Sequence, residues 1–196
     1  IPQQYIRWAN NIIHGDFGES IKYKRPVMDL IKERLPNTIL LGSVSLIITY
    51  IISFTLGIVS GRYAYTISDY SIQVFNYIML AIPSFIAGVF AIFFFAFQLN
   101  LFPFQGSVDI NVQEGTFSYY INKLYHTILP AVTLGLLSTA GYIQYLRNDI
   151  IENSQKDYVL TARSKGLSTN RIYMKHILRN SLIPIITFLG ADIVSI

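Results

Sequence analysis

The sequence contains no cysteine and few charged residues. The lack of cysteine among its 196 residues excludes disulfides and thiolate metal sites, and it leaves the redox compartment open. Lys, Arg, Asp and Glu make up only 13% of the chain, against ~25% in ordinary soluble domains, whereas 52% of the residues are apolar. Water is therefore not the main solvent of this chain, and the composition indicates a membrane protein.

Charge is missing altogether from three long stretches, residues 35–61, 70–108 and 124–146. Each is long enough to cross a bilayer, which takes ~20 mostly apolar residues at ~1.5 Å of rise per residue. The alternative is a soluble helical domain, but its core helices would keep one polar face, and these stretches show little helical alternation. The predicted fold is all-α, a polytopic bundle of transmembrane helices.

The pattern divides the chain into a mixed segment and a membrane domain. Residues 1–37 intersperse basic and acidic side chains and predict a solvent-side or interfacial segment, in which Pro26 opens a short amphipathic helix along the membrane surface. Residues 38–196 predict the transmembrane domain, with spans at about 38–61, 73–97, 127–146 and 182–196. The chain begins without Met or a leader and ends inside an apolar run, so we expect a fragment.

Small and polar residues mark special places within the predicted spans. The first and third spans are rich in Gly, Ala, Ser and Thr, which lets helices approach closely in lipid. In the second span, Pro83 and Ser84 predict a kink or a break near mid-membrane, either as a tolerated bend or as one that shapes a solute path. Asp192 is the one acid inside a span; it faces a polar path, or it lies less deep than its short span indicates.

The distribution of basic residues does not orient these spans. Lys and Arg number seven in residues 1–37 and 98–126 together, and eight in residues 62–72 and 147–181 together. Cytoplasmic loops normally carry the excess of basic residues, but so small a difference does not decide which set is cytoplasmic. The orientation has to come from another feature.

Residues 147–181, here called the elbow, predict two helices joined by a sharp turn. Residues 157–165 can be helical, Gly166 suits the left-handed position after the helix, and Ser168 suits the next N-cap. The second helix carries a basic face and an adjacent apolar face, formed by Arg171, Lys175 and Arg179 and by Tyr173, Met174, Ile177 and Leu178. On physical grounds alone, this basic elbow could simply lie on anionic lipid.

The particular residues of the elbow favour a more specific interpretation. Residues 157–168 have the sequence Asp-Tyr-Val-Leu-Thr-Ala-Arg-Ser-Lys-Gly-Leu-Ser, and residues 175–184 have the sequence Lys-His-Ile-Leu-Arg-Asn-Ser-Leu-Ile-Pro. This pattern resembles the cytoplasmic signature of binding-protein-dependent ABC importer permeases. It is most similar to the first (B-type) permease of the dipeptide, oligopeptide and nickel import systems, with Ser164 where Ala is usual. Shorter matching stretches lie at residues 15–20, 26–27, 34–38, 81–85, 102–106 and 129–135.

The resemblance implies a bundle of the type I ABC importer kind, in which the elbow is the coupling helix that docks into a separate cytosolic ATPase. Ala162 and Gly166 would lie at a tight contact with that subunit, and Arg163, Lys165 and Arg179 would make charge-assisted contacts. The full set of positions that match the coupling signature is Asp157, Tyr158, Thr161, Ala162, Arg163, Lys165, Gly166, Leu167, His176, Arg179 and Asn180. The expected solute path includes Pro83, Ser84 and Asp192.

The same resemblance implies the topology and the partners. The elbow would be cytosolic and residues 1–37 and 98–126 extracytoplasmic, with the family's first and last spans missing. The expected partners are a second, homologous permease, two cytosolic ABC ATPases that bind ATP and Mg²⁺, an extracytoplasmic solute-binding protein and the lipid of a bacterial cell membrane. The solute would be an oligopeptide or dipeptide, with nickel or a metal chelate as the alternative.

Two other classes of protein are weaker interpretations of this sequence. The chain has no Gly-(x)4-Gly-Lys-Ser/Thr phosphate loop, so we expect it neither to bind nor to hydrolyse ATP. We also expect no catalytic residue and no metal site in it. A membrane-embedded enzyme would cluster His, Asp or Glu inside the spans, whereas His14, His126 and His176 lie outside the central spans. A scaffold that merely lies on anionic lipid would not associate with an ATPase.

Overall fold

The computed structural model describes residues 2–196, which are helical along most of their length. Within these residues the only extended pairing is an isolated bridge between Glu19 and Pro26, so the predicted all-α fold is confirmed. The chain forms two compact units, residues 1–40 and residues 41–196. We describe each unit by itself.

The first unit contains helix α1 (Pro2–Ile13) and the beginning of helix α2 (Val27–Arg62). A short amphipathic helix ending near Leu35 was predicted, followed by a separate span from residue 38. That boundary is wrong, because α2 continues through Pro36 without a break. A proline removes one N–H donor, and in a helix of 36 residues the remaining backbone bonds carry the chain past it.

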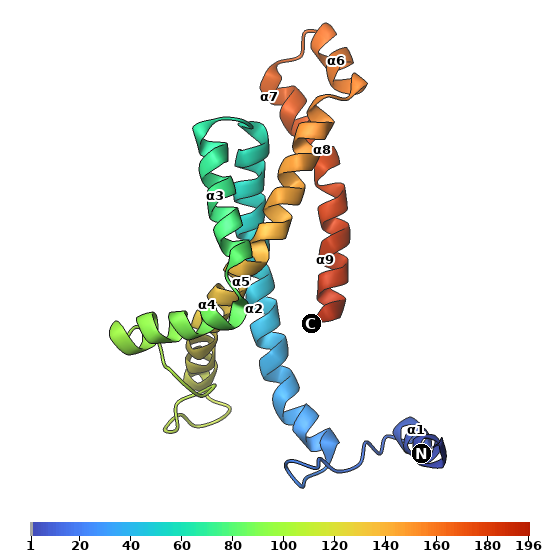
Figure 1. Cartoon of the computed structure of the whole chain (residues 1–196), viewed down its shortest axis with the longest axis vertical. Helices are drawn as coiled ribbons and strands as arrows, with labels where there is room; N and C mark the ends of the chain where they lie inside the picture. Colours follow the sequence, from blue (N-terminus) through green and yellow to red (C-terminus); the bar gives the residue numbers. More distant parts are fainter. Residues whose placement is uncertain (1) are drawn as a thin grey trace. The chain divides into compact units, whose positions relative to one another are not determined.

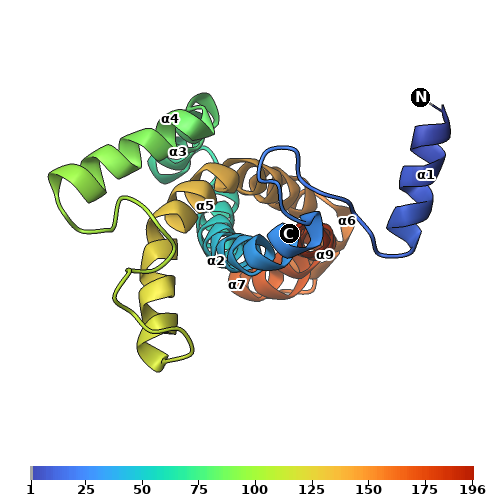
Figure 2. The same ribbon diagram turned by 90° about the horizontal axis from the view of Figure 1, so that it is seen from below.

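The second unit holds the rest of α2 and all later elements (Figure 1). In chain order these are α3 (Ile67–Ala81), α4 (Ser84–Ala91), the π-helical η1 (Ile92–Gln98), α5 (Phe117–Ser154), α6 (Asp157–Ser164), α7 (Thr169–Ile172), the π-helical η2 (Tyr173–Ile177), α8 (Leu178–Ser181) and α9 (Ile183–Ser195). In the end-on view, α9 lies beside α2 and α5, and α4 extends away from them (Figure 2). The α6–α7 turn lies at the end of the unit where α2 meets α3 (Figure 1).

Three helical runs among the described residues are long and apolar enough to cross a membrane: Val27–Arg62, Phe117–Ser154 and Thr169–Ser195. They contain the predicted first, third and fourth spans. The predicted second span is not a straight helix, because α3 and the run from Ser84 to Gln98 are bent by 98° at the Pro83 break. The expected break at Pro83 is confirmed, and it is much sharper than an ordinary proline kink.

Helix α5 is longer at both ends than the predicted third span. Residues 98–126 were expected to be a connector, but α5 already begins at Phe117, where the Thr116 hydroxyl accepts the Tyr119 N–H (3.2 Å) as an N-cap. This start could not be recognised from the sequence, because Asn122 and Lys123 interrupt the apolar run by which spans are recognised. At its other end α5 extends to Ser154, eight residues into the elbow.

Helices α2 and α5 pack closely because small residues line their contact. A Cβ atom at Gly61 would lie 2.8 Å from the Cβ of Ile150, closer than packed carbons come. Nearby, the Thr49 hydroxyl donates to the Gly135 carbonyl of α5 at 3.1 Å. The small-residue content of these spans therefore serves close helix approach, as predicted.

Candidate coupling surface and solute path

The elbow turns at Gly166. Helix α6 is capped at Lys165, and Gly166 follows with a φ of +72°. The Gly166 N–H donates to the Arg163 carbonyl (2.9 Å), and the Leu167 N–H donates to the Ala162 carbonyl (3.3 Å). These bonds form a Schellman motif, whose left-handed residue is normally glycine. The predicted helix and turn are confirmed, and Ser168 takes the N-cap position of α7, although its hydroxyl makes no cap bond.

Helix α6 has an inward and an outward side. Val159 is fully buried and Ala162 is 5% exposed, and both belong to the hydrophobic core that also contains Ile172 and Tyr173. Leu160, by contrast, is 55% exposed. Most of the polar positions of the signature on α6 and its cap are exposed as well: Asp157, Thr161, Arg163 and Lys165.

The two small residues of the signature lie in different surroundings. Ala162 was expected at a contact with a partner, but its burial places it against the chain's own core. Gly166 was expected to permit close approach of the partner; within the chain itself, a Cβ there would meet no atom within 4 Å. Its positive φ shows that the turn itself needs glycine at this position.

The second half of the elbow is wound differently from the predicted α-helix. Ile172 and Tyr173 are buried, and so are Ile177 and Leu178 five residues later, which is the spacing that a π-helical turn brings to one side. Met174 was predicted on this apolar face, but it is 53% exposed, because the wider turn of η2 rotates it outwards.

The remaining signature residues divide between surface and core. Arg179 and Asn180 are exposed, and His176 and Leu167 are half-buried. Tyr158 is half-buried as well, and its hydroxyl donates to Asn153 Oδ1 at 2.8 Å. Asn153 Nδ2 in turn donates to the Ser181 hydroxyl at 3.1 Å, which joins the end of α5 to α8.

The elbow is also bound to the end of α2. Arg62 Nη2 donates to Asn170 Oδ1 at 3.1 Å, and the Arg62 guanidinium lies 4.8 Å from the centre of the Tyr173 ring. The Tyr173 hydroxyl donates to the Ile58 carbonyl at 3.2 Å. These contacts connect the elbow directly to the end of α2.

A buried ion pair lies at the same end of the unit. Arg147 of α5 donates from Nε and Nη2 to the two carboxylate oxygens of Asp69 in α3, both at 2.7 Å. Asp69 is fully buried and also accepts bonds from the Ser60 hydroxyl (2.5 Å) and the Tyr65 N–H (2.7 Å). The pair joins α2, α3 and α5. Sequence reasoning missed it, because 78 positions separate the partners and no local pattern connects them.

Asp192 lies where α9 meets α2 and α5. The hydroxyls of Tyr50 and Tyr142 both donate to its Oδ2, at 2.6 and 2.7 Å, and the two rings lie 5.2 Å apart. Among residues 2–196, no cationic side chain forms an ion pair with Asp192.

Ser84 lines a cavity of about 270 Å³ between α4, the connector before α5 and α5 itself. His126 lies in its wall, with Nδ1 3.2 Å from the Gly106 carbonyl and Nε2 3.2 Å from Asp109 Oδ1. Pro83 precedes Ser84 as the residue before α4 and sets the bend that brings this wall together. Asp192 does not line this cavity, so the expected path residues belong to two separate places.

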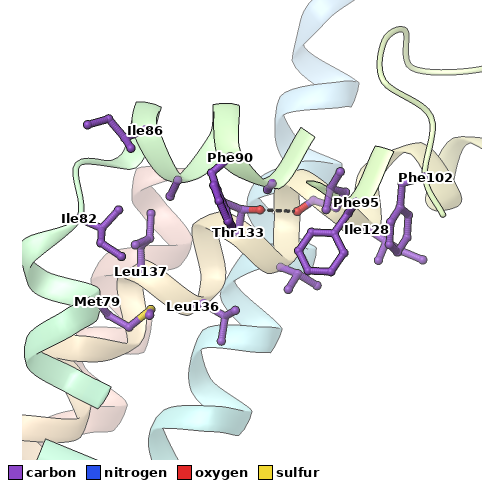
Figure 3. Close-up of a pocket in the computed structure, with 14 residues that line it drawn as sticks. Met79, Ile82, Ile86, Phe90, Phe95, Phe102, Ile128, Thr133, Leu136 and Leu137 are labelled. Carbon is purple, nitrogen blue, oxygen red and sulfur yellow. Dashed lines mark hydrogen bonds between the residues drawn. The ribbon is translucent and has the colours of Figure 1, made fainter. Parts of the chain in front are cut away.

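A second cavity, of about 620 Å³, lies between α3, α4, η1 and α5 (Figure 3). Its wall consists of apolar side chains, among them Met79, Ile86, Phe90 and Leu136. Its one hydroxyl, that of Thr133, is already bonded to the Leu129 carbonyl at 2.8 Å. Such a surface suits hydrocarbon, not the amide groups of a peptide.

These features define a class of protein. Apolar helices long enough to cross a membrane are joined by a polar elbow with exposed basic residues, which is the organisation of a multi-pass membrane protein. Residues 53–196 match the family described as the inner membrane component of binding-protein-dependent transport systems, and the chain belongs to this family. It is accordingly an inner-membrane component of a transport system, in agreement with the resemblance of the elbow's sequence to importer permeases.

Several curated relatives are similar over almost the whole chain. One is the oligopeptide transport system permease protein AppB of Bacillus subtilis, 40% identical over 98% of this chain and 60% of the relative. Another is the dipeptide transport system permease protein DppB of Lactococcus lactis subsp. cremoris, 34% identical over 96% of this chain and 58% of the relative. A third is the oligopeptide transport system permease protein OppB of Haemophilus influenzae, 33% identical over 99% and 60%. The chain thus spans about three fifths of the length of these relatives.

Proposed function

We propose that the chain forms part of the path for oligopeptides or dipeptides in an ATP-driven importer and couples that path to ATP hydrolysis by separate subunits. The observation that carries the proposal is the two-sided α6. Val159 and Ala162 are packed into the core, whereas Leu160, Arg163 and Lys165 are exposed and available to a partner. Arg163 lies beside the core, at the wall of a cavity that Ile150 and Tyr173 also line. The names of the relatives supply the solute class.

The partner at the elbow is a cytosolic ABC ATPase, which holds ATP and Mg²⁺. Exposed Leu160 supplies an apolar anchor, and Arg163 and Lys165 supply charge-assisted bonds to acidic groups of a cleft. A second, homologous permease and an extracytoplasmic solute-binding protein complete the importer. In this arrangement the elbow is cytosolic, and residues 1–37 and 98–126 are extracytoplasmic.

Coupling proceeds through contacts within this chain. When the ATPases close around ATP they move α6, whose Val159 and Ala162 press on the core formed with Ile172 and Tyr173. The bonds from Tyr173 and Asn170 to the end of α2 pass this motion to the spans. The path itself includes Ser84 at the Pro83 bend, and the carboxylate of Asp192 offers a polar group within the bundle.

Reconstitution of the complete importer tests this assignment. With its ATPases and its binding protein, the complex should hydrolyse ATP faster when an oligopeptide is bound by the binding protein, and it should accumulate that peptide in vesicles. Stimulation by a nickel chelate and not by peptides would replace the peptide assignment with the metal alternative.

Arg163→Glu tests the elbow. Charge reversal at the proposed ATPase contact should lower peptide uptake by about tenfold or more, since a lost charge-assisted contact costs about 1.5–3 kcal/mol. Lys32→Glu makes the same change at an exposed position of α2 in the first unit and should leave uptake unchanged. If the Arg163→Glu complex keeps full, coupled uptake, the elbow does not have this role.

A further inference from the structure

Helix α1 (Pro2–Ile13) carries its apolar and polar residues on opposite sides. At ~100° per residue, the apolar residues fall within an arc of about 160° and the polar residues within the opposite arc of about 120°. The apolar arc consists of Pro2, Tyr5, Ile6, Trp8, Ala9, Ile12 and Ile13, and the polar arc of Gln3, Gln4, Arg7, Asn10 and Asn11. The prediction of a solvent-side or interfacial segment over residues 1–37 did not distinguish this helix from the rest of the segment.

Most of the apolar side of α1 is exposed in the described chain, and only Ala9 and Ile12 are half-buried. No residue of the helix is buried, and Tyr5, Ile6, Trp8 and Ile13 are between 52% and 81% exposed. So many exposed apolar residues on one short helix mark a surface that binds a membrane or another protein.

The chemistry of this side fits one occupant. Tyr5 and Trp8 lie one turn apart with ring centres separated by 5.6 Å, and these two residue types concentrate where the acyl chains of a bilayer meet the headgroups. The helix has no acidic residue and one basic residue, Arg7, on its polar side, which an anionic headgroup layer attracts.

The position of α1 in the chain keeps it near a membrane. Thirteen residues separate Ile13 from Val27, the first residue of the span-containing α2. Even fully extended they reach about 45 Å, so α1 cannot move far from the surface that α2 enters. A tethered amphipathic helix binds that surface without the cost of a free encounter.

We propose that α1 is an interfacial helix that lies in the plane of the membrane, with Tyr5, Trp8 and Ile12 inserted at the boundary between headgroups and acyl chains. This anchors the segment before α2 to lipid and does not depend on which solute the importer carries. The proposed depth is about 5–10 Å into the boundary region, the range typical of such helices.

Trp8 makes the proposal directly measurable, because it is the one tryptophan of these 196 residues. The complete complex is placed in bilayer discs that contain phosphatidylcholine brominated either near the headgroup or near the end of the acyl chain, and tryptophan emission is recorded. The same measurement on a Trp8→Phe complex removes the contribution of every other tryptophan. The shallow bromine should quench the Trp8 emission at least about twice as strongly as the deep bromine, because the proposed helix lies at the interface.

Matched variants separate insertion from mere proximity. Ile12→Glu places a charge on the apolar side and should lower the quenching of Trp8 by at least about half, since burying an unpaired carboxylate opposes insertion. Asn10→Glu places the same charge on the polar side and should leave the quenching unchanged. Trp8 emission typical of water, or emission shielded from water but not quenched by either bromolipid, overturns the proposal; the second result would indicate a protein as the occupant.

Discussion

At the scale of single residues, the Asp69–Arg147 pair shows how this membrane domain handles charge. Asp69 is fully buried and receives two bonds from Arg147 and one each from Ser60 and Tyr65. A carboxylate in such surroundings is tolerated only because all of these donors compensate its lost hydration.

Removal of one partner should therefore be far worse than removal of both. Asp69→Asn leaves Arg147 buried without a counter-charge and should destabilise the complex by about 3–5 kcal/mol. The double variant Asp69→Asn with Arg147→Met should recover a large part of that loss. Thermal unfolding of the purified complexes measures both.

The exposed ion pair between Glu152 and Lys156, near the same end of the protein, is the control. Glu152→Gln should change the unfolding temperature little, because water screens that pair. Equal losses for Asp69→Asn and Glu152→Gln would mean that the buried pair contributes no more than a surface one.

Asn76 is a second buried polar residue, but unlike that of Asp69 its side chain has no hydrogen bonds within residues 2–196 to compensate its lost hydration. Its side chain is fully buried in α3, and neither its Oδ1 nor its Nδ2 has a hydrogen-bond partner in the described chain. Nothing in the sequence distinguishes it from a surface asparagine, because the surroundings of a residue on a span are set by the helices that pack against it.

At the scale of elements, the sequence predicted what depends on local chemistry. The turn at Gly166 follows from a backbone conformation that glycine adopts, and the break at Pro83 follows from a missing donor, so both could be recognised from single residues. Pro36 shows the limit of this reasoning, since the same residue type stays inside a continuous α2. The exposure of Met174 depends on the π-helical winding of η2, which no residue pattern announced.

The connector between η1 and α5 is held by Asp109. Asn122 Nδ2 donates to its carboxylate at 2.7 Å, the Asp109 N–H donates back to Asn122 Oδ1 at 2.9 Å, and His126 lies at 3.2 Å on the other side. The bond from Asn122, and then that from His126, hold the pKa of Asp109 below its usual value.

This arrangement predicts a pH dependence for the connector. Because the folded pKa of Asp109 lies below the unfolded value of ~3.9, its ionised form stabilises the connector above that pH, and the stabilisation is lost as the pH falls through the folded pKa. Hydrogen exchange of residues 107–112, corrected for its intrinsic pH dependence, should accelerate below about pH 4.

Asn122→Ala should produce the same acceleration at neutral pH, because it removes both bonds to Asp109. The exposed Asn111 of the same connector provides the control, and Asn111→Ala should leave exchange unchanged. Unaltered exchange in the Asn122→Ala protein would show that the connector is held by other contacts.

At the scale of the whole molecule, the order of spans could be predicted because charge-free runs are long and unambiguous. The packing of one helix against another could not be predicted, because it depends on contacts between distant positions. Tyr50 and Tyr142, for example, lie 142 and 50 residues before Asp192, to which both donate hydrogen bonds. The proposed orientation in the membrane rests on the resemblance of the elbow's sequence, because the count of basic residues does not decide it.

The proposed orientation can be measured with cysteines, since residues 1–196 contain none. Ser107→Cys and Ser164→Cys introduce thiols at exposed positions of the connector before α5 and of α6. In intact cells, a membrane-impermeant maleimide should label Cys at position 107 and not at position 164. In inverted vesicles the labelling should be reversed, and labelling of both from one side would refute the topology.

The π-helical segment η2 contains one residue more than an α-helix would place in that turn, as the bond from the Leu178 N–H to the Tyr173 carbonyl shows. Deleting a single residue there would restore α-helical winding and rotate α6 and α7 by about 100° relative to α9. The inward residues Val159 and Ala162 would then leave their place in the core. A one-residue insertion or deletion between Gly166 and Pro184 should therefore disrupt the core far more than one in the exposed connector around residues 110–115.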